Sequence, residues 1–408
     1  MTASVTGTNL GTRIRNTLPS GRLVPIDFVR GIIMILMALD HASIINPYHA
    51  AGEGFLGGRP EYPDPITFLT RFLTHYCAPG FLFLAGTAIT LSTFKRKEKG
   101  DTQNAISQHL IIRGLILLLI EWTLISTLFS SFGAVQFYFG ILACIGIGMI
   151  TFAFAHRLPS SVITITSIGI ILLSPIMLLS PIITFETETN EIVRFLAVAL
   201  FYPMTYEGRL YGIYPLVPWI GVMGLGVVFG RWLLRQQEIS SSNRKIAERL
   251  GIAGGLCLVV FFVSRVAALL GIQTWPANYL DPESLAIEHF FLIAKYPPSI
   301  AFLLWTIGGI LLLLAIGFYF QENSRFRSMM TPVLLFGATA LFFYCVHITL
   351  YMSGAIFVWT QISYEPGVFD ALIVSLIWWI MVLLVLIPLC FWFRDIKNKH
   401  PTSVLKYI

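Results

Sequence analysis

The chain has 408 residues, of which 56% are hydrophobic and only 12% charged, and its mean hydropathy is +0.77. Soluble globular domains carry about 25% charged residues, so this composition excludes an ordinary soluble protein. Apolar runs of about 20 residues, the length that crosses a bilayer as a helix, recur along the chain, and the alternating segments of a membrane β-barrel are not seen. We therefore predict an all-α integral membrane protein.

The apolar runs predict about ten transmembrane helices. They fall at residues 25–46, 67–94, 109–129, 135–155, 161–183, 208–234, 249–271, 297–320, 332–359 and 368–393. The apolar stretch at 190–203 is too short to span, so we expect an interfacial or re-entrant helix there. The chain then divides into an N-terminal tail at 1–24, a single transmembrane domain at 25–395 and a C-terminal tail at 396–408.

The distribution of Lys and Arg predicts the orientation, because cytoplasmic loops of membrane proteins are enriched in these residues. With both termini in the cytoplasm, three basic stretches fall inside, namely KRKEK at 95–99, RKIAER at 244–249 and RDIKNKH at 394–400. The loops that then lie outside are acidic. Topology thus explains the net charge of +6, and no nucleic-acid partner is needed. The five cysteines form no CxxC pair, so we predict no metal site.

The first predicted span, IDFVRGIIMILMALDHASII at 26–45, carries four ionisable residues. At 100° per residue, Arg30 and His41 share one face of the helix and lie about 16 Å apart along its axis. Asp27 lies one turn before Arg30 and is expected to pair with it, which could simply anchor the helix end. Asp40 points about 100° away from His41. Ionisable groups this deep usually line a cavity or a path, so we predict a functional role for His41.

The next span contains Arg71 and His75, which are four residues apart and share a face. Pro79 frees the carbonyl of His75 and predicts a kink beside that histidine. Freed backbone is tolerated in a membrane where it meets a cavity or a polar neighbour. We therefore expect a pocket shared by His41 and His75, although a packing kink explains the same pattern.

Other ionisable residues within the spans favour an internal polar cavity when taken together. They are Arg113, Glu121, Arg265 and His347. In the span at 208–234, Gly226 and Gly230 form a GxxxG pattern. This pattern is typical of close helix packing and lacks the context of a phosphate-binding loop.

Five stretches carry a resemblance to known proteins. They are IDFVRGIIMILMALDH at 26–41, FLTRFLTHYCAPGFLFLAGTAITLS at 68–92, LYGIYPLVPWIGVMGLGVVFGRW at 210–232, KYPPSIAFLLWTIGG at 295–309 and LFFYCVHITLYM at 341–352. In order and coverage, over residues 22–395, the chain resembles the bacterial branch of the heparan-α-glucosaminide N-acetyltransferase catalytic-domain family, within the transmembrane acyltransferase superfamily. The first stretch is also similar to the opening helix of bacterial membrane sugar O-acyltransferases, which carry the same Asp-x-x-Arg-Gly and a later His.

The resemblance implies that an acyl group, in the first place acetyl, moves from cytoplasmic acyl-CoA to an amine or hydroxyl of a sugar-type acceptor outside. Acetyl-CoA or another acyl-CoA is then the co-substrate, and no metal is expected. The pantetheine arm is comparable in length with the separation of Arg30 and His41, which places the thioester near His41. Basic groups at the cytoplasmic rim are expected to hold the CoA phosphates. These cofactor-binding residues are Arg30, Arg113, Arg231, Lys95 and Arg96, with Asp27 as the partner of Arg30.

Two mechanisms stay open at this point. His41 is either a general base that deprotonates the acceptor or a nucleophile that is itself acylated. In lysosomal members of the family the position of His41 is an asparagine, and the histidine thought to be catalytic lies in the loop beyond, where this chain has His49. The catalytic histidine is therefore His41 or His49, or both act. Asp40 is expected beside the chemistry, and His75 in the same pocket.

Two rival interpretations are a polytopic transporter of a glycan precursor or proton-coupled solute, and a non-catalytic membrane component. Buried Asp, His and Arg with broken backbone also describe transporters, but no inverted repeat is visible. The departure from the lysosomal pattern favours a multi-pass protein of a prokaryotic cytoplasmic membrane. The acceptor, the choice between amine and hydroxyl, the acyl chain length and the oligomeric state stay open, a homodimer being one option for the last.

Overall fold

The structure is a computed structural model that describes residues 23–46, 62, 64–130, 137–179, 190–201, 204–206, 210–212, 214–272, 290–358, 367–400 and 403. The predicted all-α membrane fold is confirmed, because eight helices of these residues are long and apolar enough to cross a membrane. All predicted spans contain helix, but two contain shorter apolar helices than expected. These are Ile141–Ala155 within 135–155 and Ser160–Ser174 within 161–183.

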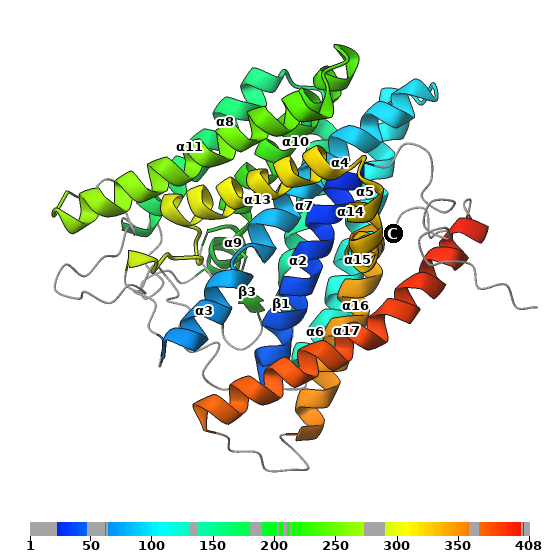
Figure 1. The fold of residues 1–408 in the computed structure, drawn as a ribbon. Helices are drawn as coiled ribbons and strands as arrows, with labels where there is room; N and C mark the ends of the chain where they lie inside the picture. The colour runs from blue at the N-terminus through cyan, green and yellow to red at the C-terminus, as the bar shows by residue number, and fades with distance from the viewer. Residues whose placement is uncertain are drawn as a thin grey trace, which may run out of the picture.

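The helices follow one another along the chain as a bundle (Figure 1). They are α2 (Val24–Ala42), α3 (Pro65–Thr74), α4 (Cys77–Glu98), α5 (Gln103–Ile120), α6 (Ser126–Ser130), α7 (Ile141–Ala155), α8 (Ser160–Leu179), α9 (Glu191–Leu200), α10 (Leu216–Glu238), α11 (Asn243–Leu269), α13 (Ile300–Phe320), α14 (Ser324–Met329), α15 (Thr331–Ala338), α16 (Ala340–Phe357) and α17 (Val368–Lys399). A 3₁₀ turn, Ser43–Ile45, extends α2, and a π-helical turn, Glu121–Ile125, joins α5 to α6. The short helix expected at 190–203 is present as α9.

Three short strands form a sheet that the sequence analysis did not predict. β1 (Phe137–Phe139) runs parallel to β3 (Leu210–Gly212), and β2 (Met204–Tyr206) runs antiparallel to β3. A strand of three residues is too short to carry a readable alternation of polar and apolar positions. Because β1 occupies the start of the predicted span 135–155, α7 begins only at Ile141, after Gly140.

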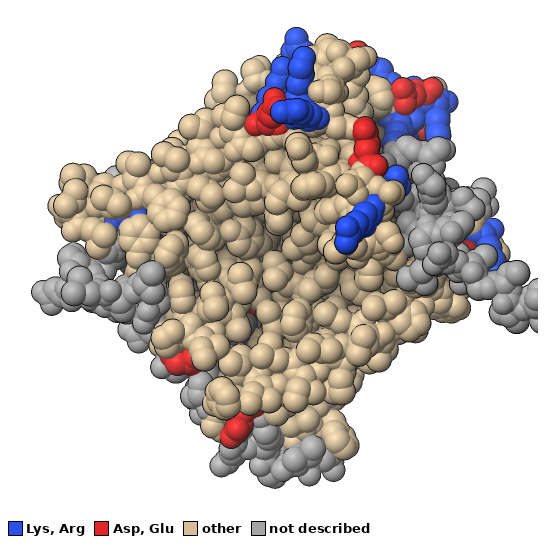
Figure 2. All heavy atoms as spheres, viewed as in Figure 1, with Lys and Arg blue, Asp and Glu red and all other residues tan. Residues whose placement is uncertain are grey.

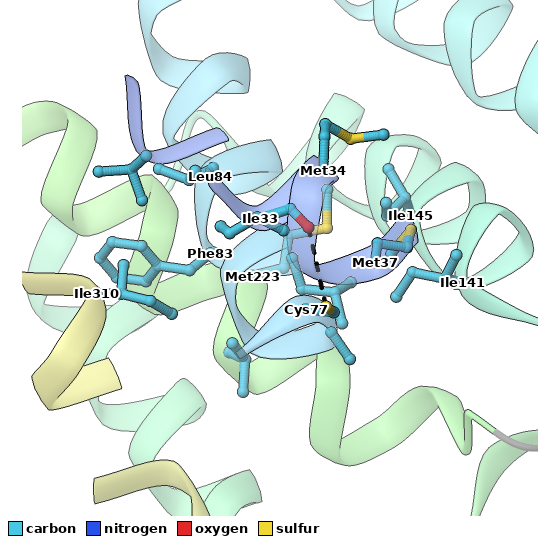
Figure 3. Packing of buried hydrophobic residues seen from close by; sticks show 14 of the residues in the cluster. Ile33, Met34, Met37, Cys77, Phe83, Leu84, Ile141, Ile145, Met223 and Ile310 are labelled. Atoms are coloured by element: carbon cyan, nitrogen blue, oxygen red, sulfur yellow. Dashed lines mark hydrogen bonds between the residues drawn. The ribbon is translucent and has the colours of Figure 1, made fainter. Parts of the chain in front are cut away.

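The first helix, α2, lies at the centre of the bundle. It packs against α3, α4, α13, α15, α16 and α17. Figure 3 shows how side chains of α2, including Ile33, Met34 and Met37, meet residues of α4, α7, α10 and α13 in the core. This central place explains why a helix with several ionisable residues is more than half buried within the protein.

The interface of α4 with α10 depends on glycines that lie against the backbone of the opposite helix. A Cβ at Gly86 would lie 1.9 Å from the backbone oxygen of Met223, and one at Gly226 would lie 2.0 Å from that of Phe83. Thr87 Oγ1 bonds to the oxygen of Gly226 at 3.2 Å across the same contact. The close packing expected from the GxxxG pattern is therefore confirmed.

Charged side chains gather at one end of the bundle. The last turns of α4, α10 and α17 are basic and carry Lys95, Arg96, Lys97, Arg235, Lys397 and Lys399. Figure 2 shows blue Lys and Arg spheres gathered mainly along the upper and right-hand edges and a broad uncharged surface across the middle. We call the end where α4 and α10 finish and α2 begins the basic end.

Candidate active site

A wide cavity opens at the basic end, and we call it the vestibule. Its volume is about 760 Å³, and α2, α4, α5, α10 and α17 contribute to its wall. Among the described residues that line it, six are cationic and three are acidic. The cationic residues are Arg30, Lys95, Arg96, Lys99, Arg113 and Lys397, and the acidic ones are Asp27, Glu98 and Asp101. The excess of positive charge makes the vestibule suited to a polyanion.

Specific contacts hold the basic groups of the vestibule in place. Arg30 Nη1 lies 3.3 Å from Asp27 Oδ1, which confirms the predicted pair, and 3.3 Å from the carbonyl oxygen of Gly337 on α15. Arg96 Nη1 bonds to Asp101 Oδ2 at 2.6 Å, and its Nη2 donates to His109 Nδ1 at 2.9 Å. These contacts orient the guanidinium groups before any ligand arrives.

A narrower cavity adjoins the vestibule within the bundle, and we call it the channel. It has a volume of about 220 Å³ and shares Arg30, Ala88, Arg113 and Lys397 with the vestibule. Its other lining residues are mostly apolar and come from α4, α5, α7, α15, α16 and α17. Tyr344 of α16 is also part of this lining. The channel therefore lies between the charged vestibule and the first turns of α16.

The segment where α15 ends and α16 begins also forms part of the channel wall. The helices are interrupted at Thr339, and residues 337–342 all contribute to the wall. Amides at a helix N-terminus carry partial positive charge and suit anions. The first turn of α16 thus adds to the positive potential near Arg30 and Arg113.

Two histidines form a hydrogen-bonded pair close to the inner part of the channel. His41 Nδ1 of α2 lies 2.8 Å from His347 Nε2 of α16, and His347 is fully buried. The ring of Tyr344 packs edge-on against both imidazoles, with centroids 6.4 Å from His41 and 5.5 Å from His347. We call His41 and His347 the histidine pair.

The contacts of His347 fix the tautomers of the neutral pair. His347 Nδ1 lies 2.9 Å from the carbonyl oxygen of Phe343, which can only accept, so this nitrogen carries the proton. Its Nε2 is then the acceptor, and His41 Nδ1 donates to it. The basic lone pair of His41 is consequently on Nε2. Such an imidazole, oriented by a second group, suits a general base or a nucleophile.

Asp40 contacts a different helix from the one that His41 contacts, as the helix geometry predicted. Its carboxylate is paired with Arg71 of α3, and both side chains are largely buried. Close by lies Lys295, which is only 2% exposed and has its ammonium 4.9 Å from the centre of the Tyr296 ring. Asp40, Arg71 and Lys295 all lie within electrostatic reach of the Cys77 thiol. A charged cluster therefore flanks the histidine pair on the side away from the basic end.

The remaining predicted site residues lie elsewhere. The ring contacts of His75 in the described part of the chain are with Phe72 and Phe302, so a pocket shared with His41 stays a prediction. The break beside His75 is confirmed, since α3 ends at Thr74 and α4 begins at Cys77. Arg231 bonds to the oxygens of His156 and Leu158 and does not line the vestibule or the channel. His49 lies outside the described residues.

The structure shows different surroundings for three of the other ionisable residues in the spans, and an internal polar cavity common to all of them stays a prediction. Arg113 lines both the vestibule and the channel. Glu121 Oε1 accepts from the Gly140 amide at 2.8 Å, so this carboxylate caps the start of α7, where the helix dipole favours it. Arg265 Nε donates to the carbonyl of Phe290 at 2.7 Å.

Sequence reasoning missed Tyr344 and Lys397 as lining residues, and it missed the partnership of His347. His347 had been noted as a buried histidine, and Lys397 lies in a basic stretch, but neither signal names a partner. The pairing of His41 with His347 joins α2 to α16, and no local pattern reveals a contact of that range.

Comparison with known proteins agrees with this geometry. No curated protein matches the chain. The profile of the heparan-alpha-glucosaminide N-acetyltransferase catalytic domain matches residues 22–266, which is more than half of the 408 residues. This match is shorter than the resemblance at 22–395 and includes Arg30 and His41 but not His347. The chain belongs to the heparan-alpha-glucosaminide N-acetyltransferase catalytic-domain family and is accordingly a membrane acetyltransferase.

Proposed function

We propose that the protein transfers an acetyl group from acetyl-CoA to an amine or hydroxyl of a saccharide-type acceptor, and that the two substrates approach from opposite ends of the bundle. The basic end is taken as the cytoplasmic face of a prokaryotic plasma membrane. The observation that carries the proposal is that the vestibule and the channel share part of their walls, and that Tyr344 of the channel wall contacts both members of the histidine pair. Family membership does not favour the rival transporter interpretation.

The dimensions and polarity of the two cavities fit an acyl-CoA. The vestibule has charge for the phosphates, and charge-assisted hydrogen bonds from Arg are the strongest available contacts. The apolar wall of the channel suits the pantetheine arm. Along α2, Arg30 and His41 are about 16 Å apart, which matches the distance between phosphates and thioester in order of magnitude. The thioester would then lie beside His41.

His41 acts on the acceptor in this proposal. Its Nε2 takes the proton of the acceptor amine or hydroxyl as that group attacks the thioester carbon, and the proton later leaves with the CoA thiol. Alternatively, Nε2 attacks first and carries the acetyl group to the acceptor. Incubation with radiolabelled acetyl-CoA without acceptor, followed by acid quenching, separates the routes, because label on the protein that is lost in His41→Gln indicates the second.

Ligand binding tests the donor half of the proposal without knowledge of the acceptor. A ligand at about 100 times its dissociation constant stabilises the folded state by ~2.7 kcal/mol. We expect CoA and acetyl-CoA to raise the melting temperature of the detergent-solubilised protein. The rise should be smaller in Arg30→Gln and Lys397→Gln and unchanged in the control Arg244→Gln, whose side chain is exposed and pairs only with Glu248 among the described residues. No rise at millimolar ligand would contradict the proposal.

A further inference from the structure

We propose that Tyr344 is a catalytic residue, whose phenolic hydroxyl donates a hydrogen bond to the thioester carbonyl oxygen and stabilises the negative charge that develops there. This inference rests on the proposed function. It assigns a second chemical role in the site, distinct from the proton transfer of His41. Sequence patterns gave no indication of it, because one tyrosine in an apolar span is usually a packing residue.

The position of Tyr344 connects the donor's path with the histidine pair. It lines the channel, and it is three residues before His347 on the same face of α16. Its ring lies at 74° to His41 and 68° to His347. A thioester brought along the channel to within reach of His41 would therefore pass beside this ring.

The hydroxyl of Tyr344 is available for such a bond. Tyr344 is 5% exposed and lines the channel, and no hydrogen bond joins its hydroxyl to another of the described residues. A hydroxyl on the channel wall that makes no bond within the protein can donate to a ligand without first breaking an internal hydrogen bond. A phenol also suits this role, because it donates a proton to a hydrogen bond without surrendering it at neutral pH.

Tyr351 supplies an internal comparison on the same helix. Its ring also packs against His347, with centroids 5.9 Å apart, and its hydroxyl likewise has no hydrogen-bond partner in the part of the chain that the structure describes. Tyr351 differs in lying against Trp378, fully buried and outside the channel wall. An unpartnered hydroxyl alone therefore does not mark the role, whereas an unpartnered hydroxyl on the channel wall does.

The reaction step balances with this assignment. The acceptor nitrogen or oxygen forms a bond to the thioester carbon, the carbonyl electron pair moves to oxygen, and His41 Nε2 takes the acceptor proton. The Tyr344 hydroxyl keeps its proton and donates to the oxyanion. When the electron pair returns, the C–S bond breaks and CoA leaves as a thiol with the proton from His41. Preorganised donors of this kind typically contribute about 10²- to 10³-fold in kcat.

Infrared spectroscopy of bound acetyl-CoA, labelled with ¹³C at the acetyl carbonyl, tests the contact directly. A hydrogen bond polarises the carbonyl and lowers its stretching frequency, so we expect a lower band in the wild-type protein than in Tyr344→Phe. Tyr351→Phe should keep the wild-type band. Because Phe preserves the ring, both variants should fold, and melting temperatures verify this. Acetyl-CoA that binds with the same band in wild type and Tyr344→Phe would overturn the inference alone, whereas absence of binding would overturn the proposed function with it.

Turnover gives the second readout. CoA thiol release should fall about 100- to 1000-fold in kcat for Tyr344→Phe, with the KM for acetyl-CoA within about twofold of wild type. Tyr351→Phe should stay within about threefold of wild type, as expected for a residue that only packs. Wild-type kcat in Tyr344→Phe would contradict a catalytic role.

Discussion

His41, near the end of α2, and His347, in the middle of α16, are joined by a 2.8 Å hydrogen bond across 306 positions of the chain. Because His347 Nδ1 donates to the backbone of Phe343, the bond dictates which nitrogen of His41 is basic. A backbone carbonyl of α16 thus determines, through His347, which ring nitrogen of His41 on α2 carries the proton. His347 is in this sense a positioning residue, which acts through His41.

The histidine pair can be tested with variants that differ in one acceptor. His347→Leu keeps the volume but removes the acceptor for His41 Nδ1–H, so the imidazole loses its fixed tautomer. We expect kcat to fall by about 10²- to 10⁴-fold, as for other misoriented imidazoles, with acetyl-CoA binding retained. His347→Gln supplies an amide oxygen and should recover part of the activity. Equal losses in both variants, with intact binding, would contradict the positioning role.

The glycine contact between α4 and α10 predicts a large effect on stability. Gly226→Ala places a methyl group against the backbone of Phe83, which cannot move without separating the helices. We expect a loss of about 1–3 kcal/mol or more, measured as a lower melting temperature in detergent. Gly251→Ala is the matched control, because a Cβ there meets nothing within 4 Å. It should be neutral or stabilising by up to about 1 kcal/mol.

The buried side chain of Lys295 predicts that, unlike the change at Gly226, its removal does not lower stability. Its ammonium is buried beside the Tyr296 ring, and no carboxylate within the described residues pairs with it. Taking one ion out of water costs several kcal/mol, and no ion pair within the described residues offsets that cost for Lys295. Lys295→Met should therefore leave the melting temperature unchanged or raise it. A fall of several degrees would show that the charge stabilises the fold after all.

The start of α3 predicts a dependence of stability on pH. Asp64 Oδ1 accepts from the amides of Ile66 and Thr67 at 2.8 and 2.9 Å, and Oδ2 accepts from Thr67 Oγ1 at 2.6 Å. Burial raises the pKa of the Asp64 carboxyl, but these hydrogen bonds outweigh it and hold the pKa below its ordinary value. The ionised cap therefore stabilises fully above the unfolded pKa of about 3.9, and this contribution is lost as pH falls through the lower folded pKa.

Variants at position 64 test the direction in which stability changes with pH. Asp64→Ala should lower stability by about 1 kcal/mol at neutral pH, the usual value of an N-cap. Its difference from wild type should shrink as pH falls below about 4. Asp64→Asn keeps an accepting oxygen without a titrating group, so its stability relative to Asp64→Ala should not change with pH. A constant difference between wild type and Asp64→Ala at all pH values would count against the assignment.

Sequence periodicity predicted the parts of this molecule that depend on one helix. The shared face of Arg30 and His41 was correct, since both residues lie on the α-helix α2, Val24–Ala42. The divergence of Asp40 from His41 was also correct, because Asp40 meets Arg71 on α3. Both follow from the 100° rotation per residue. Both predictions needed only the geometry of α2 and no knowledge of the neighbouring helices.

The parts that depend on several helices could not be predicted in this way. The channel exists because α15 stops at Thr339 and exposes residues 337–342, and the local sequence contains no proline that would mark that break. For Arg231, a role in binding the CoA phosphates stays a prediction. Its position near the end of α10 suggested the vestibule, but its guanidinium donates to backbone carbonyls in the turn between α7 and α8. The contacts of a long side chain depend on which groups the assembled bundle places within its reach.

The length of α17 has a consequence for how the membrane itself affects the enzyme. Its 32 residues extend about 48 Å, whereas the hydrocarbon core is about 30 Å thick. Figure 1 shows this helix, in orange and red, lying obliquely along the bundle, and its last turn brings Lys397 to the vestibule. A thinner bilayer tilts such a helix further and moves that lysine. We expect turnover in vesicles of one headgroup to vary with lipid chain length, and a flat profile would argue against this mismatch sensitivity.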